Sequence, residues 1–235
     1  MKTPLLSICI PTYNRSQLIK RLAESILASN ENIELCVCVD GSDDCTEDYL
    51  KAITDVRLKI KSTINNYGRA SALYSSVELA SGKYIMIFDD DDWLDARDIE
   101  RVCLDCSKRL MPNQVGYVYH MRDHSGNRLG HAFQQKISNF LELYADYSVS
   151  HDKKEVLLSC ALKTVMGRTS QRRIPTSLYL SKLALNYDVV CMNYCIGQKN
   201  YLYDGMTSSI TQLKLQSPWP LAQLHFVRIR GFFGR

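Results

Sequence analysis

The stretch that most constrains the fold is a run of five apolar or aromatic residues at 84–88, which leads directly into four consecutive aspartates at 89–92. An uninterrupted apolar run, here preceded by Gly82, is typical of a strand buried on both faces of a parallel sheet. Four adjacent negative charges repel one another, so they need solvent or a cation. At the carboxyl end of a buried parallel strand they would lie where open α/β sheets bind their ligands.

Two interpretations of the four carboxylates stay open. Carboxylate oxygens in an Asp-x-Asp arrangement are ligands that Mg²⁺ and Mn²⁺ prefer, and a bound metal would offset the repulsion. Alternatively, Asp91 or Asp92 caps the helix that the pattern predicts from about residue 95. A calcium loop of the EF-hand type starting at Asp89 is excluded, because Leu94 would occupy the position that requires glycine.

The composition is that of a globular protein. The 235 residues are 46% hydrophobic, enough to bury a sizeable core in one large domain, or in one domain and an appendage. No apolar run reaches 18 residues, so no transmembrane helix is predicted. Pro4, Ser7 and Pro11 interrupt the first apolar stretch and favour a strand there over a signal peptide. The nine cysteines, several of them inside predicted strands, favour a reduced, cytoplasmic protein.

Strands and helices are predicted to alternate through the first half of the chain. Buried strands are predicted at residues 5–10, 33–39 and 84–88, with an edge strand at 57–64. Helices are predicted at about 16–29, 46–53 and 69–81. This alternation indicates an α/β fold with a mostly parallel sheet. The loops at 11–15, 40–44 and 89–92 each follow a strand and should meet at one sheet edge.

The second half carries weaker patterns. A helix is expected to end before Pro112, and two runs around a turn-rich linker predict a hairpin of residues 115–121 and 128–133. Further helices are predicted at 139–147, 154–165 and 177–186. A last strand at 188–193 and a polar loop at 201–209 follow.

Taken together, these residues resemble the family-two glycosyltransferases, whose fold is the nucleotide-binding GT-A type. The resemblance covers residues 5 to about 95 and rests on four motifs in the family's order. They are Ser-Ile-Cys-Ile-Pro-Thr-Tyr-Asn-Arg at 7–15, Val-Asp-Gly-Ser-Asp-Asp at 39–44, Asn66-x-Gly68, and Gly82-Lys83-Tyr84 running into the acidic cluster. Any one motif is weak, but the four together identify the family.

The resemblance implies a mostly parallel, Rossmann-like sheet flanked by helices, with a helical C-terminal extension. Residues 1–112 would form the nucleotide-sugar-binding half and residues 113–212 the acceptor-binding half of the same domain. Residues 213–235 would form a basic amphipathic tail.

The resemblance also implies roles for the loop residues. The expected nucleotide-binding residues are Pro11, Thr12, Tyr13, Arg15, Asp40, Asn66, Gly68, Arg69, Asp89 and Asp90. Among them, Pro11 and Tyr13 would pack the base, and Asp40 would accept a hydrogen bond from it. The expected ligands of Mn²⁺ or Mg²⁺ are Asp91, as the direct ligand, and Asp89. The alternatives are that Tyr13 is an ordinary packing residue, that Asp40 caps a turn, and that Arg69 is a solvated charge.

The mechanism that the family implies is a single displacement. An acceptor hydroxyl attacks the anomeric carbon as the nucleoside diphosphate leaves, so the configuration inverts, and the metal stabilises the growing charge. A carboxylate must accept the hydroxyl proton. Thr176 stands where related chains carry an acidic residue, and threonine cannot act as this base. Asp152 and Glu155 are the base candidates, with solvated helix-start charges as the alternative.

Two functions follow as hypotheses. The first is an inverting, metal-assisted glycosyltransferase that takes a sugar from a nucleotide-sugar donor such as a UDP-sugar. Its acceptor would be a glycan or a lipid-linked glycan in bacterial surface polysaccharide biosynthesis (O-antigen, capsule or lipopolysaccharide). The second is a catalytically weak nucleotide-sugar-binding partner in a polysaccharide assembly complex. No nucleic-acid partner is expected, and an oligomer stays open.

The C-terminal tail suggests contact with a membrane. After Asp204 the chain has no acidic residue, and its basic residues there include Lys214, Arg228, Arg230 and Arg235. A helix beginning after Pro220 would carry one stripe made of Trp219, Ala222, Phe226, Ile229 and Phe233. Interfacial helices combine such a stripe with basic residues. The tail is therefore expected to hold a cytoplasmic enzyme at the inner face of the cytoplasmic membrane; packing on the domain, or an oligomer contact, is the alternative.

Overall fold

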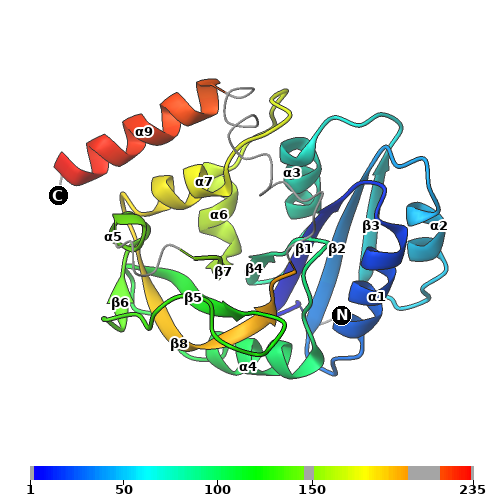
Figure 1. The fold of residues 1–235 in the computed structure, drawn as a ribbon, viewed down its shortest axis with the longest axis horizontal. Helices are drawn as coiled ribbons and strands as arrows, with labels where there is room; N and C mark the ends of the chain where they lie inside the picture. The colour runs from blue at the N-terminus through cyan, green and yellow to red at the C-terminus, as the bar shows by residue number, and fades with distance from the viewer. Residues whose placement is uncertain (1–2, 146–150, 201–217, 234–235) are drawn as a thin grey trace.

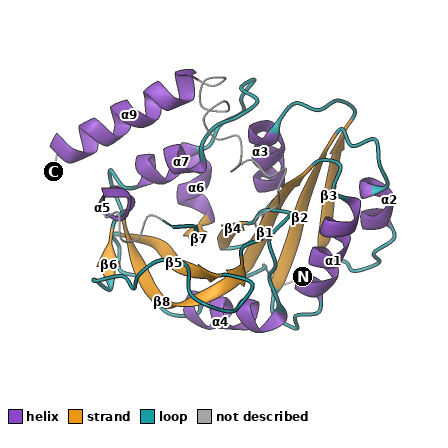
Figure 2. Ribbon diagram, viewed as in Figure 1, coloured by secondary structure: helices purple, strands orange, loops and turns teal. Residues whose placement is uncertain are grey.

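The structure, a computed structural model, describes residues 3–145, 151–200 and 218–233. In these ranges a sheet of eight strands forms the centre of the molecule, with helices on both of its faces (Figure 1 and Figure 2). Along the chain the strands are β1 (Leu6–Thr12), β2 (Ile33–Asp40), β3 (Leu58–Thr63), β4 (Tyr84–Ile87), β5 (Gln114–Arg122), β6 (Ile137–Ser138), β7 (Lys153–Leu158) and β8 (Asp188–Gln198). Across the sheet their order is β3-β2-β1-β4-β7-β5-β8-β6.

The helices cover the sheet through two hydrophobic clusters. They are α1 (Ser16–Leu27), α2 (Thr46–Lys51), α3 (Arg69–Leu79), α4 (Ala96–Cys106), α5 (Phe140–Ala145), α6 (Ser159–Val165), α7 (Thr176–Leu183) and α9 (Pro218–Phe233). One cluster packs α1 and α4 on one face, and the other packs α3, α6 and α7 on the opposite face. Successive residues of a strand alternate between the two, as Ile8 and Cys9 of β1 do.

The first four strands confirm the predicted α/β architecture. Strands β3, β2, β1 and β4 pair in parallel. Every residue of β1 and of β2 is buried, which explains why their sequences are largely apolar. Strand β3 lies at the edge of the sheet and is half-buried, as its alternating sequence predicts.

The predicted helix over residues 154–165 is wrong in its first half. Residues 153–158 form β7, which pairs antiparallel with both β4 and β5, and only Ser159–Val165 is helical. Strand β7 lies between β4 and β5 in the sheet, so Val156 and Leu157 are buried. A Cβ at Gly116 of β5 would lie 2.0 Å from the Val156 carbonyl oxygen, so only glycine allows this close approach. Tertiary packing therefore overrides the local pattern.

The predicted hairpin after β5 is also wrong. Both sides of β5 are occupied, by β7 and by β8, so residues 128–133 have no strand to pair with beyond one bridge between Arg122 and Arg128. The side chain of Asn193 on β8 holds this segment instead. The Phe133 N–H donates to Asn193 Oδ1 at 2.7 Å, and Asn193 Nδ2 donates to the Phe133 carbonyl at 3.0 Å. Strand β8 extends to Gln198, five residues beyond its predicted end at 193.

The first turn of helix α4 shows which aspartate caps this helix. Its N-cap is Asp95, whose Oδ1 accepts a hydrogen bond from the Asp98 N–H at 2.9 Å. The interpretation of Asp91 or Asp92 as the cap is therefore wrong, and the four aspartates have other partners.

In the C-terminal part, the predicted polar loop lies outside the described residues, whereas the predicted helical extension is present. The predicted polar loop at 201–209 lies outside the described residues, as do residues 146–147 of the helix predicted at 139–147. The expected helical extension is present as α9, which begins at Pro218 and contacts α7 and α5. Within the described part of the chain, no helix combines the length and the apolar character needed to cross a bilayer.

A buried carboxylate joins the amino-terminal ends of the central strands. Glu34 of β2 accepts hydrogen bonds from Ser7 Oγ at 2.6 Å and from the Gly82 N–H at 3.1 Å, and it forms an ion pair with Lys59 at 2.6 Å. Burial raises the pKa of Glu34, but the hydrogen bonds from Lys59, Ser7 and Ser81 outweigh burial and leave the pKa below its usual value.

We expect Glu34→Gln to lower the free energy of unfolding by about 1–3 kcal/mol at neutral pH, because several buried donors lose an ionised partner. A carboxyl whose pKa is lowered by folding stabilises the protein above its unfolded pKa, about 4.3, and this contribution is lost as the pH falls through the folded pKa. Urea unfolding should therefore show a constant difference between wild type and variant from pH 7 to pH 5, and a shrinking one below that. A difference that grows in acid would contradict this role.

Candidate active site

The loops that follow β1, β2 and β4 meet at one edge of the sheet, as predicted. The Thr12 hydroxyl at the end of β1 donates to Asp90 Oδ2 at 2.6 Å, which links the first loop to the acidic loop. Asn14 Nδ2 donates to Asp43 Oδ1 at 2.6 Å, which links it to the loop after β2. Pro11 is buried within β1, whereas the ring of Tyr13 is exposed at the end of the strand. The Tyr13 ring is thus open for stacking, and Pro11 lies in the strand just before it.

The carboxylate of Asp40 holds the turn that contains Asn66 and Gly68. Its Oδ1 accepts from the Tyr67 N–H at 2.9 Å, and its Oδ2 accepts from the Gly68 N–H at 2.7 Å. Asp40 is buried beneath the turn. The structure therefore shows the turn cap that was one of the two interpretations of Asp40, while a contact with a nucleobase stays a prediction.

The same turn is covered by the loop that precedes α7. Arg172 donates to the Asn66 carbonyl at 2.8 Å and to Asn66 Oδ1 at 2.6 Å, and its own carbonyl accepts from the Ala70 N–H at 3.1 Å. Gly68 has φ 97°, and a Cβ there would lie 2.5 Å from the Arg172 carbonyl oxygen. The two halves of the chain are thus in direct contact at this turn. No sequence motif marks Arg172, so the sequence alone does not predict this contact.

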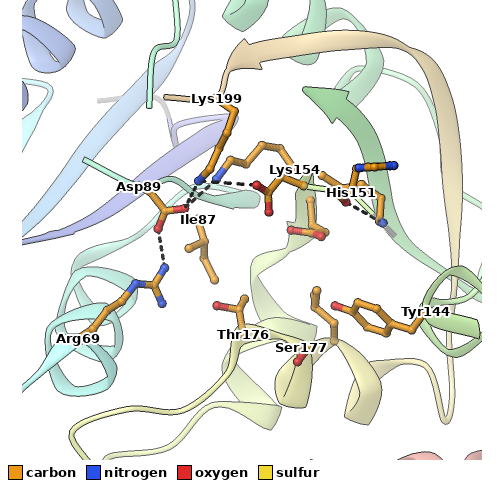
Figure 3. Close-up of a pocket in the computed structure, with 13 residues that line it drawn as sticks. Arg69, Ile87, Asp89, Tyr144, His151, Lys154, Thr176, Ser177 and Lys199 are labelled. Carbon is orange, nitrogen blue, oxygen red and sulfur yellow. Dashed lines mark hydrogen bonds and ion pairs between the residues drawn. The ribbon is translucent and has the colours of Figure 1, made fainter. Parts of the chain in front are cut away.

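Three cations neutralise the acidic loop after β4. Asp89 accepts hydrogen bonds from Arg69 at 2.6 Å and from Lys154 of β7 at 3.1 Å (Figure 3). Asp92 forms ion pairs with Lys199 at 3.3 Å and with Lys154 at 3.4 Å, and its Oδ1 also accepts from the Asn200 N–H at 3.1 Å. Burial alone would raise the pKa of Asp89, but the charges of Lys154, Arg69 and Lys199 hold it well below its usual range. The charge repulsion inferred from the sequence is thus largely offset by the protein itself.

The two middle aspartates, Asp90 and Asp91, form no ion pair with Arg69, Lys154 or Lys199. Burial raises the pKa of Asp90 to about 7, and the neighbouring Asp91 and Asp89 act in the same direction, while the Thr12 hydroxyl and the charge of Arg15 oppose them. Asp91 is half-buried, and it has no hydrogen-bond or ion-pair partner within the described ranges. Of the four carboxylates, Asp91 is therefore the one whose oxygens are open to a further cation.

Of the two expected metal ligands, Asp91 has oxygens open to a divalent ion, whereas Asp89 is held by other partners. Within the described part of the chain, no three His, Cys, Asp or Glu side chains gather into a metal-binding cluster. Mg²⁺ does not require one, because it is often held by one or two carboxylates together with substrate phosphates and waters. Asp91 fits such a site. Asp89, the other expected ligand, is already engaged by Arg69 and Lys154.

A pocket opens beside the acidic loop, between β7 and the start of α7. Its lining residues are Arg69, Ile87, Asp89, Tyr144, residues 151–155, Thr176, Ser177, Leu180 and Lys199 (Figure 3). Both base candidates, Asp152 and Glu155, are among them, and so is Thr176. Burial raises the pKa of Glu155 to about 7, against the opposing charges of Lys154 and Lys153. A carboxyl group that is partly ionised at neutral pH therefore lies in the same pocket as Asp89.

The sequence alone does not predict the roles of Lys154, Lys199 or Tyr144. Single lysines and tyrosines carry no spacing signal, and the sequence pattern predicts a helix rather than a strand at Lys154. The one available signal was the charge of four adjacent aspartates, which requires cations but does not say which residues supply them.

Comparisons with known proteins show the family to which the chain belongs. A sequence model described as glycosyl transferase family 2 matches residues 7–152, more than half of the chain. Hyaluronan synthase of Pasteurella multocida is 38% identical over 106 residues, 44% of this chain and 11% of that protein. Chondroitin synthase of Escherichia coli is 34% identical over 143 residues, 58% of this chain and 20% of that protein.

A shorter relative is the Escherichia coli protein WfgD, named UDP-Glc:alpha-D-GlcNAc-diphosphoundecaprenol beta-1,3-glucosyltransferase. It is 30% identical over 116 residues, 49% of this chain and 44% of that protein. The chain thus spans less than half the length of each of these relatives.

Solved structures share the fold. S. aureus TarS 1-349 in complex with UDP-GlcNAc has a TM-score of 0.72 at 16% identity, over 87% of this chain and 61% of that one. Mannosyltransferase PcManGT from Pyrobaculum calidifontis in complex with GDP-Man and Mn2+ has a TM-score of 0.66 at 16% identity, over 98% of this chain and 65% of that one. The GT-A fold expected from the resemblance is confirmed.

The contact between the turn and the loop before α7 can be tested with two glycines of positive φ. Gly68→Ala introduces both an unfavourable backbone conformation and a clash with Arg172. Gly126 has φ 84° and no other heavy atom within 4 Å of where a Cβ would lie, so Gly126→Ala introduces only the unfavourable backbone conformation. Alanine at a glycine of positive φ costs about 1–3 kcal/mol of backbone free energy at either position, and the clash should add about 1–3 kcal/mol at Gly68. Equal losses in the free energy of unfolding of the two variants would contradict the contact.

Proposed function

The chain belongs to glycosyl transferase family 2, and we propose that it transfers a sugar from a nucleotide-sugar donor to a hydroxyl group of an acceptor, with inversion at the anomeric carbon. The observation that carries the proposal is that one pocket contains both Asp89 of the neutralised acidic loop and an opposing carboxylate, Glu155. Residues 1–112 would hold the donor, and residues 113–212 the acceptor.

The donor is proposed to be a UDP-sugar. The exposed ring of Tyr13 and the turn held by Asp40 lie at the sheet edge where open α/β folds bind nucleotides. Arg69 begins α3 and lines the pocket, where its guanidinium would approach the diphosphate. The similar TarS structure contains UDP-GlcNAc, and the name of WfgD contains UDP-Glc.

A divalent ion, Mn²⁺ or Mg²⁺, is proposed to bind Asp91 together with the phosphate oxygens of the donor. When bound, such an ion stabilises the negative charge that grows on the departing diphosphate. The chain's own contribution is to keep Asp91 open while Arg69 and Lys154 hold Asp89 in place. The similar PcManGT structure contains Mn2+ with GDP-Man.

The metal proposal predicts that UDP binding depends on Asp91. In wild type, EDTA should weaken UDP binding by about tenfold or more, the effect of losing a charge-assisted contact of about 1.5–3 kcal/mol. Asp91→Asn should bind UDP equally with and without Mn²⁺, as measured by calorimetry. Asp48→Asn, the same change at an exposed aspartate on α2, should behave like wild type. UDP affinity in wild type that EDTA does not change would contradict the proposal.

Glu155 is proposed as the general base. The acceptor oxygen would form a bond to the anomeric carbon, its proton would pass to the Glu155 carboxylate, and the bond from the anomeric carbon to the diphosphate would break. A base works best when its pKa lies near the working pH, and burial raises the pKa of Glu155 to about 7. Asp152 lines the same pocket but is more exposed, so it serves as the comparison.

We expect Glu155→Gln to lower kcat by about 10²–10⁴-fold with little change in the affinity for UDP, because the variant loses proton transfer alone. Asp152→Asn should have a much smaller effect. In wild type, kcat/KM should rise as the pH increases through about 7, since Glu155 must be ionised to accept a proton. Wild-type turnover in Glu155→Gln would show that the base lies elsewhere.

The biological role is proposed to be bacterial surface polysaccharide synthesis, with a glycan or lipid-linked acceptor at the cytoplasmic face of the membrane. The names of the relatives support this: they include hyaluronan and chondroitin synthases and a glucosyltransferase for a diphosphoundecaprenol-linked sugar. The second candidate, a nucleotide-sugar-binding protein of weak activity, is favoured by Thr176, which lines the pocket at the family's base position. Consumption of nucleotide sugars by the purified protein separates the two.

A further inference from the structure

We propose that α9 binds an anionic membrane surface while it stays packed on the domain. The contact surface is its exposed apolar stripe, which consists of Trp219, Phe226, Ile229 and Phe233. This inference adds a partner to the proposed function, and its geometry does not depend on which sugar is transferred.

One face of α9 is fixed to the domain. Leu224 is buried, and a Cβ at Gly231 would lie 2.2 Å from Leu141 Cδ1, so the helix backbone is in close contact with α5 at this point. The Arg228 guanidinium lies over the ring of Tyr144, 4.6 Å from its centroid. In Figure 1, α9 lies beside α7 and α5 at the outside of the molecule, and it contacts both. The alternative that the tail packs on the domain is therefore correct for this face of the helix.

The opposite face of α9 is apolar and exposed. Trp219 is 65% exposed, Phe226 67%, Ile229 58% and Phe233 87%. Their spacing of seven, three and four residues places them on one side of a helix, away from Leu224 and Gly231. Five of the twelve large hydrophobic side chains that are exposed in the described part of the chain lie on this one helix. Such a concentration of exposed aromatic residues marks an interaction surface.

The charges of α9 select a lipid surface as the partner. The helix contains no acidic residue, and its ionisable side chains are His225, Arg228 and Arg230. Arg230 is exposed and flanks the stripe. Arg228 packs on the domain, so Arg230 is the arginine available to anionic lipid. Exposed aromatic residues that enter the headgroup region, combined with a basic side chain and no acidic one, are features of interfacial helices.

The position of α9 links this surface to the pocket. Tyr144 lines the pocket, and Arg228 of α9 covers its ring. The pocket wall and the membrane-facing helix are therefore separated by one layer of side chains. An acceptor carried by a lipid would need to reach the pocket from the bilayer surface, and this arrangement brings the two together.

The inference is tested by co-sedimentation of the full chain with vesicles. Wild type should pellet with vesicles that contain phosphatidylglycerol, less in high salt, and only weakly with pure phosphatidylcholine vesicles. The double variant Phe226→Glu/Ile229→Glu should lower the partition coefficient about tenfold or more, because it removes two exposed apolar side chains and adds two negative charges. Val56→Glu/Ile64→Glu, at an 86% exposed valine and a 95% exposed isoleucine on either side of β3, also removes two apolar side chains and adds two charges; this matched control should bind like wild type.

Three results would overturn the inference: failure of wild type to pellet with anionic vesicles, equal binding of wild type and the double variant, and a wild-type dimer that the double variant abolishes without any vesicle binding. The last result would show that the stripe meets a second copy of the chain. UDP binding without vesicles, measured on the same variants, keeps this test separate from the proposed transferase function. Failure of vesicle binding with normal UDP affinity would remove only the membrane contact.

Discussion

The arrangement of the molecule depends on the neutralisation of the acidic loop after β4. Four adjacent aspartates at the end of a buried strand would repel one another, and removing one partner from a buried ion pair leaves an uncompensated charge. Lys154 and Lys199 reach Asp89 and Asp92 from β7 and from the end of β8. These lysines are 65 and 107 residues away from their partners in the sequence, so the loop acquires its shape only when the second half of the chain folds against the first.

This dependence also explains how the site is divided between the two halves. The first half supplies the exposed ring of Tyr13, the turn held by Asp40 and the open carboxylate of Asp91. The second half supplies the lysines, the loop of Arg172 that covers the turn, and Glu155 in the pocket. Helix α9 packs on the outside of this half, where Arg228 lies over the ring of Tyr144. We propose that its exposed face contacts the membrane.

The sequence predicted the first half well because its signals are local. Apolar runs define β1, β2 and β4, and the family motifs fall on the loops that follow them. The second half was predicted less well because its strands are defined by distant partners. Residues 153–158 become a strand only because a place is free between β4 and β5, and residues 128–133 stay irregular because β5 is already paired on both sides. Lys154 and Lys199 carry no motif, so only the folded structure identifies them.

Donor hydrolysis by the purified protein tests whether this pocket transfers a sugar with inversion. Purified protein is incubated with Mn²⁺ and a panel of nucleotide sugars, water takes the place of the acceptor hydroxyl, and NMR identifies the first anomer released. A single displacement predicts consumption of at least one donor and a released sugar of inverted configuration, such as β-glucose from an α-linked UDP-glucose. Release with retained configuration would contradict the single displacement, and UDP binding without consumption of any donor would favour a binding protein.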